Sequence, residues 1–366
     1  MKITFPHMGN LYIPVKGLLE YLNLDVIVPP PSSQKTLNLG VKYGPEFACL
    51  PLKLNLGNLI EAREIGADTV IMAGGVGPCR FGLYSQTEKE ILNDLGYDYD
   101  CLVLEPPDKH LGQFIMRLRK IIGTNSWWRV IDAIKFAYQK AYAVDLVEKK
   151  VQHLRPLEKK FGTADSIYRH VLNTINDAQS INSLQEATNL GILKLEQIPQ
   201  NINSEVIRIG LIGEIYTLLE PFVSFDIEKE LGKLGVQVTR SLYLSEWINS
   251  HLLMNYYKKE QSKPFAKLAK PYLNYFVGGH GRETIGYAVG FAQEGYHGLI
   301  QIAPLTCMPE IIAHTILPRV KENYRIPILT IYVDEQSGKA GFLTRIEAFI
   351  DLIKRQQENN KRRIVL

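Results

Sequence analysis

Short apolar segments alternate with longer amphipathic segments in two separate stretches of this sequence, and this alternation restricts the possible folds most strongly. The apolar segments are rich in Val, Ile and Leu and have the length of buried strands. The segments between them repeat apolar residues at the spacing of a helix face. Strands of this kind, separated by helices, form parallel sheets that are covered on both faces. The sequence therefore predicts an α/β protein.

The two stretches are expected to contain four strands each. In the first stretch they are Lys2–Phe5, Asp25–Val28, Thr69–Ala73 and Cys101–Leu104. In the second they are Val206–Ile212, Val236–Ser241, Leu299–Ile302 and Ile328–Tyr332. The helices expected around the first set are Tyr12–Leu22, Leu52–Ile65, Ser85–Leu95 and Lys109–Ile122. Those expected around the second set are Ile227–Leu234, Ser245–Tyr257, Arg282–Glu294, Glu310–Asn323 and Gly341–Gln356.

No strand pattern occurs between the two stretches. The segments Trp127–His153, Ile167–Ala178 and Leu184–Glu196 have helical spacing instead. We therefore expect two Rossmann-like parallel-sheet domains with a helical segment between them. The expected boundaries are residues 1–125 for the first domain, 126–200 for the helical segment and 201–366 for the second domain.

Composition argues against several classes of protein. The net charge is only +4 over 366 residues, and no basic run is interleaved with aromatic residues, so nucleic acid is not an expected partner. No apolar stretch approaches the roughly 18 residues of a membrane span, and the first residues do not have the pattern of a secretory signal. Four cysteines in a chain of this length do not make a disulfide framework. We expect a cytoplasmic protein with reduced thiols.

Three of the four cysteines occupy expected strand-to-helix connections. Cys49 and Cys307 share the pattern Cys-x-Pro ahead of an amphipathic helix, and proline favours the first helical turn. Cys79 lies in a glycine-rich turn after the strand Thr69–Ala73 and is followed by Arg80. A helix N-terminus or a cationic neighbour lowers the pKa of a thiol. Cys101, inside an expected strand, is instead interpreted as a small buried hydrophobe.

The spacing of these cysteines indicates which metal group they would suit. Structural zinc sites and redox dithiols normally have local C-x-x-C pairs, which this sequence lacks. Three scattered cysteines fit a 4Fe–4S cluster with three thiolates, which leaves one iron for water, a substrate oxygen or a side chain. A common site would lie in the cleft between the two domains. Structural zinc stays an alternative.

Two further residues are candidates for this cleft. Glu214 follows the expected strand Val206–Ile212 and the tight turn Gly210-x-x-Gly213, whose dinucleotide-binding fingerprint is incomplete. His280 stands in a glycine-rich loop ahead of a helix, where it is a candidate acid, base or anion contact. For both residues a purely structural role is an open alternative.

The chain resembles the 2-hydroxyacyl-CoA dehydratase superfamily, and most closely its stand-alone members related to acyl-CoA dehydratase activases. The matching residues run through nearly the whole chain: Gly44–Pro51, Gly74–Gly82, Gly210–Tyr216, Gly278–Gly281, Ala303–Glu310, Asp334-Glu335 and Thr344–Phe349. The Cys-Met-Pro-Glu and Thr-Arg-Ile-Glu-Ala-Phe stretches are the most specific.

This resemblance implies an oxygen-sensitive protein with a 4Fe–4S cluster on Cys49, Cys79 and Cys307. It implies an ATP-hydrolysing iron–sulfur activator as electron donor, an acyl-CoA thioester as a possible substrate, and low-potential reduction or radical dehydration as the reaction. The dehydratases are pairs of related subunits, so we expect a homodimer or a related partner chain. A non-catalytic electron relay or assembly subunit is the alternative. A related group with a double-cubane cluster needs more cysteines than these three.

Overall fold

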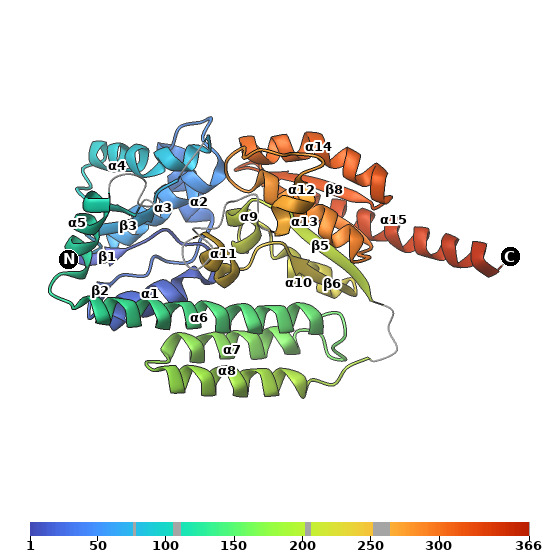
Figure 1. Cartoon of the computed structure of the whole chain (residues 1–366), viewed down its shortest axis with the longest axis horizontal. Helices are drawn as coiled ribbons and strands as arrows, with labels where there is room; N and C mark the ends of the chain where they lie inside the picture. Colours follow the sequence, from blue (N-terminus) through green and yellow to red (C-terminus); the bar gives the residue numbers. More distant parts are fainter. Residues whose placement is uncertain (76–77, 105–110, 202–205, 252–263, 366) are drawn as a thin grey trace. The chain divides into compact units, whose positions relative to one another are not determined.

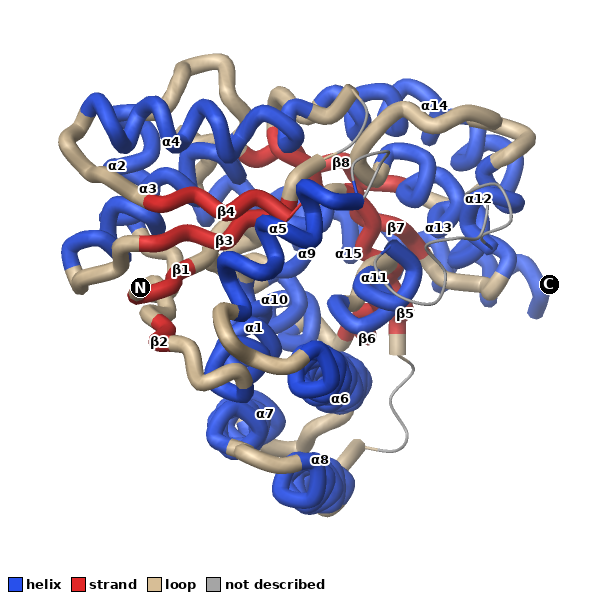
Figure 2. The backbone as a smooth tube through the Cα atoms, turned by 60° about the vertical axis from the view of Figure 1, so that its left-hand side comes forward, coloured by secondary structure: helices blue, strands red, loops and turns tan. Residues whose placement is uncertain are grey.

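The computed structural model describes residues 1–75, 78–104, 111–201, 206–251 and 264–365. It confirms the expected α/β fold, because it contains two four-stranded sheets whose paired strands are all parallel. The strands of each sheet are visible side by side in Figure 2, and Figure 1 labels the helices that follow them.

Both sheets have the same strand order. The first is ordered β2-β1-β3-β4 and the second β6-β5-β7-β8. The strands of the first sheet are β1 (Lys2–Thr4), β2 (Asp25–Val26), β3 (Thr69–Ala73) and β4 (Asp100–Leu104). Those of the second are β5 (Ile207–Gly213), β6 (Val236–Arg240), β7 (Gly298–Pro304) and β8 (Ile328–Val333). In this order the winding of the chain reverses between the first and third strands, and ligands bind at the carboxyl ends of strands there.

The helices around the first sheet include one that the sequence pattern did not indicate. They are α1 (Tyr12–Tyr21), α2 (Gln34–Tyr43), α3 (Leu50–Glu64), α4 (Tyr84–Asp94) and α5 (Leu111–Ile122), with the short 3₁₀ turns η1 (Gly9–Leu11) and η2 (Arg80–Leu83). The unexpected helix, α2, begins at a capping box in which the Ser33 side chain accepts from the Thr36 N–H. Helix α3 is buried along nearly its whole length.

Glycines bring α2 and α3 into backbone contact. A Cβ at Gly40 would collide with the carbonyl oxygen of Lys53, and one at Gly57 with that of Thr36. Near the second sheet, α12 (Pro264–Ala269) and α13 (Gly281–Gln293) meet in the same way, because a Cβ at Gly286 would collide with the Phe265 carbonyl. Each sheet therefore has a glycine-packed helix pair ahead of its third strand.

The chain divides into two compact units that are not continuous in sequence. The first unit contains Met1–Leu146, His170–Leu190 and Tyr243–Tyr257, and the second contains Val147–Arg169, Gly191–Leu242 and Lys258–Leu366. Both units take parts of the expected helical segment, which forms α6 (Trp127–Leu154), α7 (Thr163–Asp177) and α8 (Ile181–Glu196). The remaining helices are α9 (Ile215–Leu219), α10 (Ile227–Lys233), α11 (Leu244–His251), α14 (Met308–Tyr324) and α15 (Lys339–Val365).

A carboxylate on α6 caps α11 within the first unit. The Asp145 side chain accepts hydrogen bonds from the backbone N–H of Leu244 at 3.3 Å and of Ser245 at 2.7 Å. These N–H groups belong to the first turn of a helix and have no partner within it. The late segment that begins at Tyr243 is thus anchored to a much earlier one. The sequence predicted α11 to continue to Tyr257, but residues 252–257 lie outside the described part of the chain.

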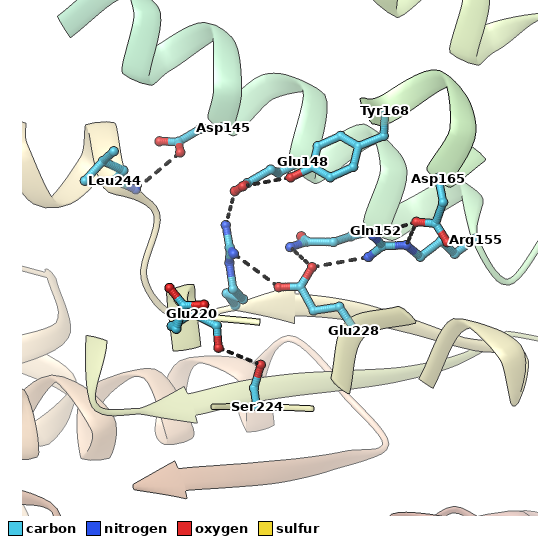
Figure 3. Close-up of polar contacts among 11 residues, drawn as sticks. Asp145, Glu148, Gln152, Arg155, Asp165, Tyr168, Glu220, Ser224, Glu228 and Leu244 are labelled. Atoms are coloured by element: carbon cyan, nitrogen blue, oxygen red, sulfur yellow. Dashed lines mark hydrogen bonds and ion pairs between the residues drawn. The ribbon is translucent and has the colours of Figure 1, made fainter. Parts of the chain in front are cut away.

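A buried network of charges joins α6, α7, α10 and β6 in the second unit. Arg240 pairs with Glu148 and, at 3.2 Å, with Glu228. Arg155 reaches the same Glu228 carboxylate at 3.3 Å and Asp165 at 2.9 Å. Figure 3 shows Arg155 directed at the Glu228 carboxylate. Since Glu228 is shared between two arginines, losing one member would leave other charges buried without compensation.

Candidate functional site

Cys49 and Cys79 both belong to the first unit, and both stand at the N-cap of a helix. Cys49 precedes α3 and Cys79 precedes η2, and neither thiol caps its own helix. Cys79 follows β3, as predicted. The expectation that Cys49 follows a strand was wrong, because α2 ends at Tyr43 and only a turn separates it from Cys49. Val76 and Gly77, which the sequence pattern placed in a turn before Cys79, lie outside the described residues.

The two cysteine loops of the first unit lie side by side. Arg80, next to Cys79, donates a hydrogen bond from Nη1 to the Phe47 carbonyl at 2.8 Å, two residues before Cys49. The hydroxyl of Tyr84, the first residue of α4, contacts the Cys49 sulfur. The structure therefore brings Cys49 and the segment after Cys79 into one neighbourhood.

Two cationic side chains hold the loop that leads to Cys49. Arg80 binds the Phe47 carbonyl, and Lys53, only 2% exposed, donates from Nζ to the Glu46 carbonyl at 3.0 Å. Positive charge close to a thiol favours the thiolate form. The sequence indicated Arg80 as a positive neighbour of Cys79. No sequence pattern indicated Lys53, because its role depends on a side chain in the first turn of α3 that reaches back to the preceding loop.

Cys307 occupies the N-cap of α14 in the second unit, directly after β7, as predicted from Cys-x-Pro. The residue is buried. His280 is the N-cap of α13. The N-termini of α13 and α14 adjoin, because a Cβ at Gly281 would collide with the Pro309 carbonyl. His280 and Cys307 thus stand at the starts of two neighbouring helices.

A buried carboxyl group, Glu310, ties these two helices to the second sheet. It accepts from the Thr284 hydroxyl on α13 at 2.9 Å and from the Gln301 amide on β7 at 2.9 Å. Burial raises the pKa of Glu310 to about 7, and the nearby Glu214 and Glu283 act in the same direction. No sequence pattern indicated a role for Glu310, although it ends the Cys-Met-Pro-Glu stretch.

Glu214 and His280 belong to this same edge of the second sheet. Glu214 follows β5 and caps α9, accepting from the backbone N–H of Tyr216 at 3.0 Å and of Thr217 at 3.1 Å. Burial raises its pKa to about 7, although those two hydrogen bonds oppose the shift. His280 Nε2 lies 4.0 Å from the carboxylate of Glu283. The structure therefore groups Glu214, His280 and Cys307 in the second unit, and Cys49 and Cys79 in the first.

The identical strand orders relate the cysteines of the two units. Cys79 and Cys307 each occupy the N-cap position of the first helical turn after the third strand of their sheet. Cys49 and His280 each occupy the N-cap position of the last helix before that strand. Cys101 has no place in this correspondence. It lies half-buried in β4, and burial raises the pKa of its thiol, in keeping with its interpretation as a packing residue.

No protein-family model matches the chain, and no curated protein matches it. Over the described ranges, no group of three or more His, Cys, Asp or Glu side chains has a geometry suited to a metal ion. The helices in that part of the chain include none with the length and hydrophobicity needed to cross a membrane.

Proposed function

We propose that this chain binds a 4Fe–4S cluster through Cys49, Cys79 and Cys307, and that it acts in low-potential reduction or radical dehydration of a thioester-type substrate. The observation that carries the proposal is the position of the three cysteines: Cys49 and Cys307 are the N-caps of α3 and α14, and Cys79 is the N-cap of the short 3₁₀ turn η2. Helix N-termini favour negative charge, and a cluster ligand must be a thiolate.

The donor set fits such a cluster in number and chemistry. Three thiolates suit a 4Fe–4S cluster that keeps one iron for another ligand, and two of these thiols lie in adjoining loops. When bound, the cluster would supply one electron at low potential. The proposal requires Cys307 to reach the same cluster as Cys49 and Cys79, which is a condition for the experiment below to test.

Glu214 and His280 are proposed as the groups that handle protons near the reacting substrate. A carboxyl group with a pKa of about 7, as burial produces in Glu214, can both donate and accept a proton near neutral pH. An imidazole is a common general acid or base, and His280 has the Glu283 carboxylate 4.0 Å from its Nε2. Both residues stand on the edge of the second sheet that carries Cys307.

The partners in this proposal follow from the chemistry that it requires. An electron of low potential would come from an ATP-hydrolysing iron–sulfur activator protein. The substrate would be an acyl-CoA, and a second copy of the chain or a related subunit would complete the assembly. The resemblance described above supports these partners.

The decisive experiment is anaerobic purification with iron, sulfide and zinc counted per chain. The expected result is a brown protein with about four iron and four sulfide. Ser variants of Cys49, Cys79 and Cys307 should each lose most of the cluster. Cys101→Ser is the matched control and should keep it. A colourless protein with stoichiometric zinc would contradict the proposal and favour a structural zinc site.

Electron paramagnetic resonance then separates a catalyst from an electron relay. If one iron is available to a substrate, an added acyl-CoA should change the spectrum of the reduced cluster. A spectrum that stays unchanged across acyl-CoAs, with and without the activator and ATP, would instead support the relay function.

A further inference from the structure

The Tyr84 hydroxyl makes a direct side-chain contact with the sulfur of Cys49, one of the proposed ligands. Tyr84 is only 4% exposed and belongs to the hydrophobic core of the first unit with Met72 and Leu92. The ring of Phe81 meets it edge-on with 5.3 Å between ring centroids. These neighbours hold the Tyr84 ring so that its hydroxyl meets the Cys49 sulfur.

The chemistry of the two groups decides which of them donates the hydrogen bond. A phenol hydroxyl donates readily, and a thiolate, whether metal-bound or not, can only accept. Donation withdraws charge from the sulfur. Hydrogen bonds to the sulfur ligands are one of the factors that set the reduction potential of an iron–sulfur cluster. An added electron makes the cluster more negative, so a donor to its ligand stabilises the reduced form.

We infer that Tyr84 donates a hydrogen bond to the Cys49 sulfur and thereby raises the reduction potential of the cluster that Cys49 holds. This inference rests on the proposed function. Tyr84 is a positioning residue, since its hydroxyl acts on a ligand and not on the substrate. The cost of reducing the cluster, and therefore the demand placed on the electron donor, would be set partly by this hydroxyl.

The test replaces Tyr84 by Phe, which removes one oxygen atom and keeps the ring. Tyr99→Phe is the matched control, because Tyr99 is equally buried in the same core but donates to the Leu59 carbonyl at 2.7 Å. In anaerobic potential titrations, Tyr84→Phe should shift the midpoint to a more negative value, and Tyr99→Phe should match the wild type. Equal midpoints for wild type and Tyr84→Phe would overturn the inference.

A second readout needs no cluster. In cluster-free protein, loss of the donor should reduce the thiolate fraction of Cys49, and its alkylation by iodoacetamide at neutral pH should slow. Peptide mass spectrometry can follow Cys49 with Cys101 as the internal reference. An unchanged rate would show that no donor acts on the sulfur and would overturn the inference. A slower rate in a protein that never binds iron would instead support the hydrogen bond while contradicting the proposed function.

Discussion

The two sheets share one strand order, yet the carboxyl edge of the first is lined by cationic side chains and that of the second by buried carboxyl groups. In the first unit, Lys53 and Arg80 bind backbone carbonyls beside Cys49. In the second unit, the edge that holds Cys307 carries the buried carboxyl groups of Glu214 and Glu310. The topology fixes where helix N-termini gather, whereas the chemistry at those N-termini depends on individual residues. In the proposed function, the first unit supplies two sulfurs and positive charge, and the second supplies one sulfur and groups that exchange protons.

The edge strands differ in a related way. Strand β6 is tied to helices through the buried pairs of Arg240. Its counterpart β2 has only two residues, and Asp25 there is exposed. Removing a charge is therefore expected to be costly at Arg240 on the edge of the second sheet and cheap at the exposed Asp25 on the corresponding edge of the first sheet.

The largest expected effect comes from breaking the charge network. Arg240→Met should destabilise the second unit by about 3–5 kcal/mol, because it removes the arginine that pairs with the buried Glu148 carboxylate and leaves Glu228 with Arg155 as its arginine partner. Asp25→Asn on β2 should cost less than about 0.5 kcal/mol. Urea unfolding, with hydrogen exchange read at β6 and β2 amides, measures both. Equal losses of unfolding free energy in Arg240→Met and Asp25→Asn would contradict this contrast between the sheets.

The raised carboxyl pKa values predict how the second unit responds to pH. Glu310 has a pKa of about 7 when folded against an ordinary 4.5, so the folded protein holds a proton that the unfolded chain releases. Stability should be highest below pH 4.5 as far as this group is concerned, and should fall as pH rises to about 7. The loss is at most roughly 3 kcal/mol for such a shift.

Glu310→Gln should flatten this part of the pH profile, because the amide cannot ionise. Glu322→Gln, an exposed change on the same helix, is the control and should leave the profile as it is. Unfolding free energies measured from pH 4 to pH 8 would decide the matter. A profile in Glu310→Gln as steep as that of the wild type would argue against a raised pKa at this position.

Substituting the glycines between packed helices tests whether both units depend on close contact between helix backbones. Gly57→Ala in the first unit and Gly286→Ala in the second should each cost about 1–3 kcal/mol, since the new Cβ meets a backbone carbonyl. Gly290→Ala on α13 is the control. Its Cβ would lie 3.4 Å from a Leu268 methyl group, and alanine favours a helix by about 1 kcal/mol. Thermal unfolding should show losses for the first two variants only.

The smallest expected effect concerns the hydrogen bond from Arg80 to the Phe47 carbonyl. Arg80→Gln should cost about 1 kcal/mol and loosen the link between the Cys49 and Cys79 loops. The rate at which a short bifunctional thiol reagent joins Cys49 to Cys79 should fall. Arg63→Gln removes a similar bond, from Nη1 to the Ala67 carbonyl at 2.8 Å, and should leave that rate unchanged. A fall in both variants would indicate general loosening of the unit.

The sequence predicted the strands well because buried parallel strands leave a strong signal. Strand β7, buried at every residue, lies within two residues of its expected limits. Helix α2 was missed since its apolar residues are few, although the capping box at Ser33 marks its start. That omission misplaced Cys49 after a strand.

The candidate site was predictable only where a local motif encodes it. Cys-x-Pro indicated the N-caps at Cys49 and Cys307. Tyr84 and Glu310 act through contacts between helices that are distant in sequence, and these contacts depend on close approaches such as the one at Gly281. No pattern within a short window of the sequence records such an approach.

The cap that Asp145 provides to α11 has a consequence for the order of events during synthesis. The first unit includes α11 (Leu244–His251), which leaves the ribosome long after the first sheet has been made. On the ribosome, the N-terminal half of the nascent chain would therefore wait several seconds for α11 to be synthesised, at ordinary elongation rates of about 5–20 residues per second. During that interval the Asp145 carboxylate faces no α11, and the surface that α11 later covers is open to chaperones. A nascent chain stalled before Tyr243 should accordingly be more sensitive to protease than one released at full length.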